Sequence, residues 1–517
     1  MSEFTTKPFQ LIASLREVYL ALPFYRKIFF PRGLAAALNQ YNPNQLETAN
    51  NVLLELSENH WSYQPRFLLS LNIIQEFRAH QICPWLVSKL VNLAALPVGA
   101  TAVDFFYNTK IGLGSDNGIH IILSKMFGEL PESVTSVNLG SNQLDKIVGI
   151  KLAEAFASLH QSVTSVDLSD NHFFNNSGAE LALTFNALPQ NLASIDLSKN
   201  NFGIIIRKVA RAFAALPKSL ASINLSNNNL STQAADNLAR AFAALPQGLV
   251  SINLSENNFA GAELATALAG LPKSVTSVNL SANRFSDKTG TELATALAGL
   301  PKGVTSVNLS LNRLDKLAGD ELAIAFAGLP ENVTSIDLSR NALGDKTGAE
   351  LAIALKGIPR SVPSIDLSHN KLGDKTGAEL AMAFKGIPQS VTSIDLSHNA
   401  LDKLSLEDLT ALENTLPYIK TVCLSSSEIN QMTFEKCRAL IKIFPGIQNI
   451  EEHMRYKDEK NCDISRTDKH ILLRTQGVVP SLKMTCAFFV HKAIKEGDST
   501  QEIASLPDAV ADYLKLW

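Results

Sequence analysis

The middle of the chain repeats one short pattern of apolar and polar residues. The stretch 335–339 alternates polar and apolar positions, which predicts a short β-strand with Ile336 and Leu338 facing inward and Ser335, Asp337 and Ser339 facing outward. A turn follows, and then apolar residues recur at helical spacing until glycine and proline end the segment. Each unit is therefore predicted to be strand, turn, helix, turn. Because the strands run parallel, the helix serves as the crossover between them.

An asparagine follows each predicted strand at intervals of 26 to 29 residues, inside a frame of the form L-x-x-L-x-L-x-x-N-x-L. This is the frame of leucine-rich repeats, so we predict an α/β fold, a leucine-rich-repeat solenoid (horseshoe). Helices are wider than strands, which predicts a concave parallel β-sheet and convex helices. The asparagines are Asn142, Asn171, Asn200, Asn228, Asn257, Asn283, Asn312, Asn341, Asn370 and Asn399.

These ten asparagines are predicted to be structural and not to bind a partner. The chain bends after each strand and leaves N–H and C=O groups without partners in the sheet. An amide side chain can both donate and accept, so it can join its own loop to the next one. We call these residues the ladder asparagines.

Local signals also predict how the helices begin and how one strand is paired. A threonine followed three residues later by glutamate indicates a capping box, in which each side chain binds a backbone N–H of the first helical turn. Three repeats carry it, at Thr289 and Glu292, at Thr347 and Glu350, and at Thr376 and Glu379. Pro363 occupies a position where other repeats have threonine, and pairing there is predicted to start one residue later because proline has no N–H.

The repeats divide the chain into three predicted domains. Residues 1–97 lack the repeat frame and have apolar residues at helical spacing, which predicts a helical N-terminal cap or module. Residues 98–427 form the solenoid, with degenerate repeats at 103–108 and 422–427. Residues 428–517 are predicted to be a helical C-terminal cap or small domain.

Stacked repeats align equivalent side chains in columns about 5 Å apart. One outward-facing column carries Asp337, Asp366 and Asp395, and the position before the ladder asparagine carries Arg340, His369 and His398. The position after it carries Arg284, Arg313 and Lys371. These nine residues are our candidates for a protein-binding strip.

Two other interpretations of this strip stay open. It can be a solvated surface of mixed charge, in which Asn and Asp alternate because both are small and polar. It can also hold a metal at His369 and His398, although two histidines without a third ligand make a poor site. We therefore predict no metal and no cofactor.

Composition narrows the possible partners and compartments. The 46 basic and 49 acidic side chains give a net charge of −3, so bulk charge favours neither nucleic acid nor an anionic membrane. No apolar run is long enough for a transmembrane helix, and no signal peptide is evident. The five cysteines are scattered, which favours free thiols in a reducing compartment.

Sequence motifs give little support for catalysis. Cys462 and Cys486 are the best candidate nucleophiles, but His491 lies five residues from Cys486, which would point away from it on a helix. Phosphate-binding glycine loops, zinc-protease motifs and nucleophile elbows do not occur. We predict a non-enzymatic protein.

The near-identical blocks Ser-Val-Thr-Ser-Ile-Asp-Leu-Ser-x-Asn and Thr-Gly-Ala-Glu-Leu-Ala resemble ribonuclease-inhibitor-like repeats. They also resemble the leucine-rich-repeat effectors that intracellular bacterial pathogens inject into host cells. The resemblance implies synthesis in the bacterial cytoplasm, translocation by a type IV system into the host cytosol, and binding of a host protein by the concave face. The alternative is a solenoid that recruits substrate for an enzyme in the C-terminal helices, although those helices are too short for the catalytic domain of effector ubiquitin ligases.

Overall fold

The structure is a computed structural model that describes residues 39–40, 100–105, 119–128, 130–232, 234–259, 263–429, 431–446 and 449–453. Most of the predicted N-terminal domain, and residues 454–517 of the predicted C-terminal region, lie outside these residues. The chain forms two compact units, Met1–Asn253 and Leu254–Trp517, which we call unit 1 and unit 2.

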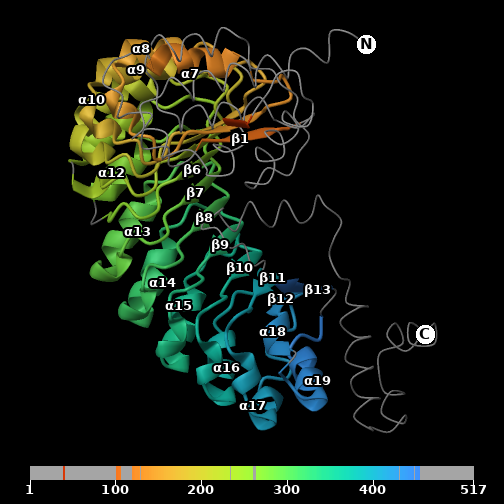
Figure 1. Ribbon diagram of the computed structural model, residues 1–517. Helices are drawn as coiled ribbons and strands as arrows, with labels where there is room; N and C mark the ends of the chain where they lie inside the picture. Colours follow the sequence, from red (N-terminus) through yellow and green to blue (C-terminus); the bar gives the residue numbers. More distant parts are fainter. Residues whose placement is uncertain are drawn as a thin grey trace. The chain divides into compact units, whose positions relative to one another are not determined.

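Unit 1 is a stack of parallel strands joined by helices (Figure 1). Each strand pairs with the next one in sequence, in register. The strands are β1 (Ala102–Asp104), β2 (Ser136–Asn138), β3 (Ser165–Asp167), β4 (Ser194–Asp196), β5 (Ser222–Asn224) and β6 (Ser251–Asn253). The helices are α7 (Ile119–Gly128), α8 (Gly149–Phe156), α9 (Gly178–Asn186), α10 (Ile206–Phe213) and α11 (Ala235–Ala243).

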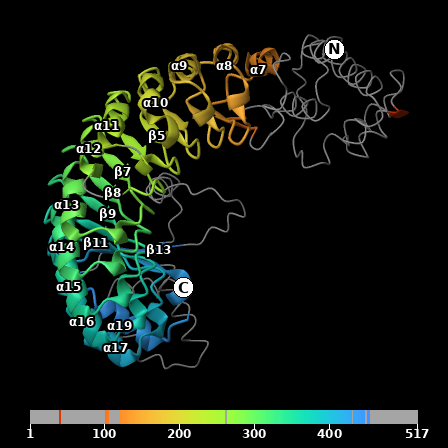
Figure 2. The same cartoon turned by 90° about the vertical axis from the view of Figure 1, so that its left-hand side faces the viewer.

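Unit 2 repeats the same plan with parallel pairing. Its strands are β7 (Ser277–Asn279), β8 (Ser306–Asn308), β9 (Ser335–Asp337), β10 (Ser364–Asp366), β11 (Ser393–Asp395), β12 (Thr421–Ser425) and β13 (Asn449–His453). Its helices are α12 (Glu263–Ala269), α13 (Gly290–Ala298), α14 (Gly319–Ala327), α15 (Gly348–Lys356), α16 (Gly377–Phe384), α17 (Leu406–Ala411), α18 (Ser426–Ile429) and α19 (Phe434–Lys442). Figure 2 shows α13 to α16 side by side on one side of the strands.

The core of each repeat lies between its strand and its helix. In the repeat of β9, Ile336, Leu338, Leu351 and Leu355 are at most 1% exposed. Ser339, which we predicted to face outward, is also buried. The predicted solenoid of parallel strands and crossover helices is confirmed. The strand β13 extends the sheet beyond residue 427, and the division into three domains otherwise remains a prediction.

The helix starts follow the predicted chemistry. The Thr347 hydroxyl accepts the Glu350 N–H at 3.2 Å, and the Glu350 carboxylate accepts the Thr347 N–H at 3.0 Å. The boxes at Thr289 and Thr376 have the same geometry. Gly348 is needed at the next position, because a Cβ there would lie 2.4 Å from the carbonyl oxygen of Glu379 on α16.

Strand pairing at Pro363 also follows the prediction. In the repeat before it, both Thr334 and Ser335 donate their N–H groups to the Thr305 carbonyl, at 2.8 and 3.0 Å. At the proline, only Ser364 donates to the Thr334 carbonyl, at 3.3 Å. Pairing therefore starts one residue later there.

In most repeats, the turn after the ladder asparagine contains a short 3-10 helix, which the sequence pattern did not predict. In unit 1 these are η1 (Leu144–Lys146), η2 (Phe173–Asn175), η3 (Phe202–Ile205) and η4 (Leu230–Thr232). In unit 2 they are η5 (Phe285–Asp287), η6 (Leu314–Lys316), η7 (Leu343–Asp345), η8 (Leu372–Asp374) and η9 (Leu401–Lys403).

Candidate functional site

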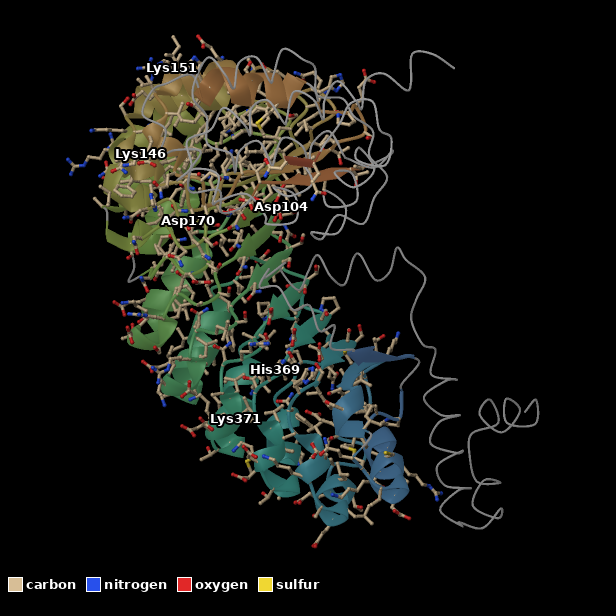
Figure 3. All side chains as sticks on the ribbon, viewed as in Figure 1. Asp104, Lys146, Lys151, Asp170, His369 and Lys371 are labelled. Atoms are coloured by element: carbon tan, nitrogen blue, oxygen red, sulfur yellow. The ribbon has the colours of Figure 1, made fainter. Side chains whose placement is uncertain are left out.

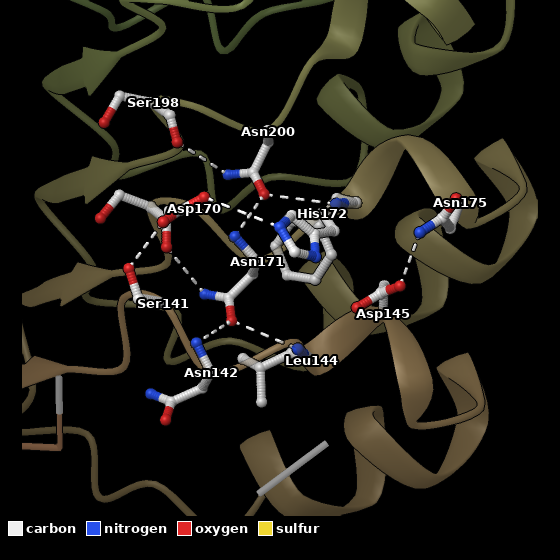
Figure 4. A network of polar contacts seen from close by, with 12 residues as sticks. Ser141, Asn142, Leu144, Asp145, Asp170, Asn171, His172, Asn175, Ser198 and Asn200 are labelled. Atoms are coloured by element: carbon white, nitrogen blue, oxygen red, sulfur yellow. Dashed lines mark hydrogen bonds and ion pairs between the residues drawn. The ribbon is translucent and has the colours of Figure 1, made fainter. Parts of the chain in front are cut away.

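The ladder asparagines are buried and join consecutive repeats. All ten have 0% exposure. The Asn171 amide oxygen accepts the N–H groups of Asn142, at 3.0 Å, and of Leu144, at 3.2 Å. Its amide nitrogen donates to the Leu139 and Ser169 carbonyls, at 2.9 and 3.1 Å. Figure 4 shows Asn142, Asn171 and Asn200 linked in this way, so the amides satisfy the backbone groups that the turn leaves unpaired.

The same turns fix the backbone on both sides of each ladder asparagine. The residues directly before and after all ten asparagines have φ between 51° and 60°, the left-handed region. We call them the pre-ladder and post-ladder positions. A left-handed residue other than glycine costs about 1–2 kcal/mol, with Asn and Asp the cheapest exceptions.

Large side chains occupy the pre-ladder positions of four consecutive repeats in unit 2, at Leu311, Arg340, His369 and His398. Leu311 is 48% exposed, Arg340 is exposed, and the two histidines are half-buried. Figure 3 marks His369, which follows β10. The predicted column thus exists, and Leu311 belongs to it, although we did not select it as a candidate.

The two histidines of this column stack on each other. The ring centroids of His369 and His398 lie 4.4 Å apart, and the ring planes are inclined by 18°. The Ser425 hydroxyl lies 3.5 Å from Nδ1 of His398. Parallel rings present a flat face to a partner and do not direct their nitrogens to a common metal. In the described part of the chain, no group of three or more His, Cys, Asp or Glu is placed to hold a metal ion.

The three candidate aspartates lie in register on β9, β10 and β11. Asp337 and Asp366 are half-buried, whereas Asp395, which we predicted to face outward, is buried. One carboxylate oxygen of each accepts the N–H of the serine two residues later, at 2.8 Å. In unit 2, Asn308 makes the same contact with its amide oxygen, also at 2.8 Å. This shared contact explains why Asn and Asp alternate along the column, since both provide the same acceptor.

The post-ladder candidates Arg284, Arg313 and Lys371 are exposed and stand at the start of η5, η6 and η8. Lys371 lies near Asp345 of the preceding repeat, with Nζ 3.6 Å from a carboxylate oxygen. The structure therefore carries the basic candidates beside the aspartate column, on the side of the sheet where the strands end. We call the pre-ladder, post-ladder and aspartate positions together the strand face.

Comparison with known proteins finds leucine-rich repeats in the sequence. A family model described as a leucine-rich repeat matches residues 160–181. A solved structure, the leucine-rich repeat-containing protein LegL7 from Legionella pneumophila, is 38% identical to this chain. The match covers 58% of this chain and 96% of that one, with a TM-score of 0.49. The chain belongs to the leucine-rich-repeat family. No curated protein sequence gives a significant match.

Unit 1 of this leucine-rich-repeat protein also has aspartates at the equivalent strand positions, Asp167 and Asp196, and the pKa of Asp167 is shifted. Burial raises the pKa of Asp167, and the neighbouring Asp196 raises it further, while the hydrogen bond with Ser169 opposes the shift. The Asn224 amide donates to Asp196 at 2.7 Å. An amide beside a carboxylate thus relieves part of the repulsion within the column.

Asp-Lys pairs such as Asp315-Lys316 and Asp345-Lys346 recur after the strands, and their alternating charges predict a solvated edge, but one of these lysines is buried. Lys346 is 5% exposed, and its ammonium donates to the carbonyls of Asp315, at 3.0 Å, and Leu317. Burial lowers the pKa of Lys346. This lysine joins two repeats, and its spacing in the sequence does not distinguish it from its exposed neighbour Lys316.

The catalytic candidates of this leucine-rich-repeat protein, Cys462, Cys486 and His491, lie outside the described residues. Within the described part, no helix is both long and apolar enough to cross a membrane. Leucine-rich-repeat solenoids typically bind other proteins.

Proposed function

We propose that this chain binds a protein partner through the strand face of unit 2, and that it is a bacterial effector whose partner is a host protein. The observation that carries the proposal is the set of large side chains at left-handed pre-ladder positions. Leu311, Arg340, His369 and His398 all occupy a backbone conformation that glycine or asparagine adopts at lower cost.

The cost of these positions supports a functional interpretation. Four such residues in neighbouring repeats sum to about 4–8 kcal/mol of conformational cost, which asparagine would largely avoid. In unit 1 the equivalent positions carry the small polar residues Ser141, Asp170 and Asn227, and Lys199 is the long side chain among them. Violation of a local rule without structural gain is typical of functional sites.

The chemistry of the strand face indicates the kind of partner. It combines an exposed leucine, a flat pair of stacked histidines, a guanidinium and a row of carboxylates. Aromatic and arginine side chains at the centre of a polar surface are typical of protein interfaces. A folded protein partner with both charges on its surface fits this arrangement best.

The effector role rests on sequence resemblance. The near-identical repeats and the 38% identity to a Legionella pneumophila protein support a bacterial origin. Translocation into the host cytosol through a type IV system, and a host protein as partner, are the parts of the proposal that follow from this resemblance alone.

Affinity capture from host-cell lysate with the full chain tests the proposal. The variant L311N/R340N/H369N places asparagine at three pre-ladder positions, so it keeps the backbone favourable while removing the side chains. We expect it to lose the partner that the parent chain captures. The variant D337N/D366N/D395N keeps each serine N–H acceptor and should weaken capture by removing charge.

A matched control changes exposed charge away from the strand face. The variant K356Q/K385Q alters two exposed lysines of α15 and its neighbour repeat and should capture the same partner as the parent chain. If the asparagine variant retains the partner while this control loses it, binding occurs on the helix side and the proposal is wrong.

A further inference from the structure

Helix α10 departs from the capped helix starts, and α8 shares part of this departure, with Lys151 as its third residue and no side-chain cap at Val148. In α9, α13, α15 and α16 the third helical residue is a glutamate that closes a capping box. In α10 this position is Lys208, it follows Arg207, and the N-cap residue Ile205 makes no side-chain hydrogen bond. The helix begins without a cap and with two cations in its first turn.

Cations in that place act against the stability of the helix. The N-terminal end of a helix carries a partial positive charge, so acidic residues stabilise the first turn and basic residues destabilise it. Arg207, Lys208 and Arg211 are all exposed, and none of them forms an ion pair with any residue that the structure describes. Their positive charge is directed to solvent without internal compensation.

Apolar side chains are exposed beside these cations. Ile204, in η3, is 60% exposed, and Leu183, on the adjacent helix α9, is 52% exposed. Arg240 occupies on α11 the helical position that Arg211 occupies on α10. Figure 2 shows α9, α10 and α11 as neighbours. We call Leu183, Ile204, Arg207, Lys208, Arg211 and Arg240 the cationic helix patch.

One exposed acid lies near the patch. Asp236 is in the first turn of α11, and its carbonyl accepts Nε of Arg240 at 3.2 Å. The carboxylate of Glu180 on α9 is engaged in the capping box with Ser177. Four cations against the two carboxylates of Asp236 and Glu180 leave a local positive excess, although the chain as a whole has a net charge of −3.

We propose that the cationic helix patch binds the surface of an anionic membrane, with Ile204 and Leu183 entering the headgroup region. Clustered lysine and arginine side chains are attracted to anionic lipids, and exposed apolar side chains add affinity by insertion. Nucleic acid would match the charge but would leave both apolar side chains in water, which favours lipid as the occupant. This surface belongs to unit 1 and is independent of the protein-binding strand face in unit 2.

Cosedimentation of the full chain with vesicles tests this inference. We expect binding to vesicles of phosphatidylcholine and phosphatidylserine mixed four to one, weaker binding as salt rises, and no binding to phosphatidylcholine alone. The variant R207Q/K208Q/R211Q should bind roughly a hundredfold more weakly, because each cation near the surface contributes roughly fivefold. The control K356Q/R360Q/K385Q removes the same charge from unit 2 and should bind like the parent chain.

A single substitution separates binding from folding. K208E restores glutamate at the third helical position, so it should raise the melting temperature while it weakens vesicle binding. A merely structural role would move both readouts together. I204S should weaken vesicle binding with every cation in place.

Three results would overturn the inference. The first is that the parent chain fails to bind phosphatidylserine vesicles, and the second is that the triple glutamine variant binds them as well as the parent chain does. The third is that the parent chain binds duplex DNA or RNA through the same cations and does not bind vesicles, in which case the patch is a nucleic-acid surface. Each result leaves the strand-face proposal untouched, because capture of a protein by unit 2 is measured separately.

Discussion

Two adjacent residues in the same turn, Arg340 and Asn341, differ in almost every respect. Asn341 is 0% exposed, and its side chain makes hydrogen bonds with two N–H groups and three carbonyls. Arg340 is exposed, and the equivalent residue varies from repeat to repeat. The solenoid thus places a buried structural residue directly beside an exposed and variable one, because the buried amide holds the turn whatever side chain stands next to it.

The strongest test of this contrast removes a ladder amide. Asn341→Ala should lower the free energy of unfolding by about 3–5 kcal/mol, because several buried backbone groups lose their partners at about 1–3 kcal/mol each. Chemical denaturation of the full chain measures the change. Asn308→Ala is the matched control, since its amide oxygen accepts only the Ser310 N–H on the strand face, and it should cost about 1 kcal/mol. Equal losses for both variants would contradict the buried-ladder interpretation.

The helix caps, like the ladder asparagines, support the fold. Removing one should lower the free energy of unfolding by less than removing a ladder amide does. Thr347→Ala removes the acceptor of the Glu350 N–H and should cost about 1 kcal/mol in the same measurement. Hydrogen bonds from the Thr347 N–H and hydroxyl lower the pKa of Glu350. The contribution of that carboxylate is therefore present at neutral pH and is lost as pH falls through its lowered pKa. A T347A chain whose stability at neutral pH equals that of the parent would show that the cap is not stabilising.

Leu311, which we propose as a binding residue, should respond in the opposite direction. Leu311→Asn should raise the free energy of unfolding by about 0.5–1 kcal/mol, because asparagine tolerates the left-handed backbone better than leucine. Partner capture should weaken in the same variant. Loss of stability would mean that Leu311 supports the fold, and the contrast between the two positions would then fail in that repeat.

The smallest effect is expected in the aspartate column of unit 1. Asp167→Asn should raise the free energy of unfolding by about 0.5 kcal/mol at neutral pH, because it keeps the acceptor for Ser169 and removes a charge whose pKa is raised by burial. The gain should shrink as pH falls through the raised pKa of Asp167 and vanish below the ordinary aspartate pKa, where the carboxyl is neutral in both the folded and the unfolded chain. Thermal unfolding across this pH range measures it. Asn138→Asp adds a charge in register with Asp167 and should have the opposite sign.

Most of the fold could be predicted because each repeat contains local sequence signals for where its strand and its helix begin. The alternation around Ile336 predicts a strand, and Thr347 with Glu350 marks the start of the helix; both signals are local. The strand β13 was not predicted from the sequence. Its residues, Asn-Ile-Glu-Glu-His, have no leucine at the second inward position and are not followed by the asparagine of the repeat frame. Its place follows from pairing with β12, which is a non-local interaction.

The candidate site could be predicted only as a set of columns. The period places His369 and His398 in one column, but the 4.4 Å stacking depends on side-chain angles that spacing does not determine. Burial of Lys346 depends likewise on where the preceding loop directs its carbonyls. Leu311 was overlooked because one apolar residue in a polar column is significant only once the left-handed backbone is known.

The left-handed backbone on both sides of the ladder asparagine also restricts which residue types can occupy the pre-ladder and post-ladder positions. None of the twenty pre-ladder and post-ladder residues is valine, isoleucine, threonine or proline, the residues that this conformation tolerates least. A combinatorial library built on this scaffold could vary all of these sites with a reduced alphabet of glycine, unbranched and amide side chains. New specificities would then be sampled without disturbing the buried amides that set the spacing of the repeats.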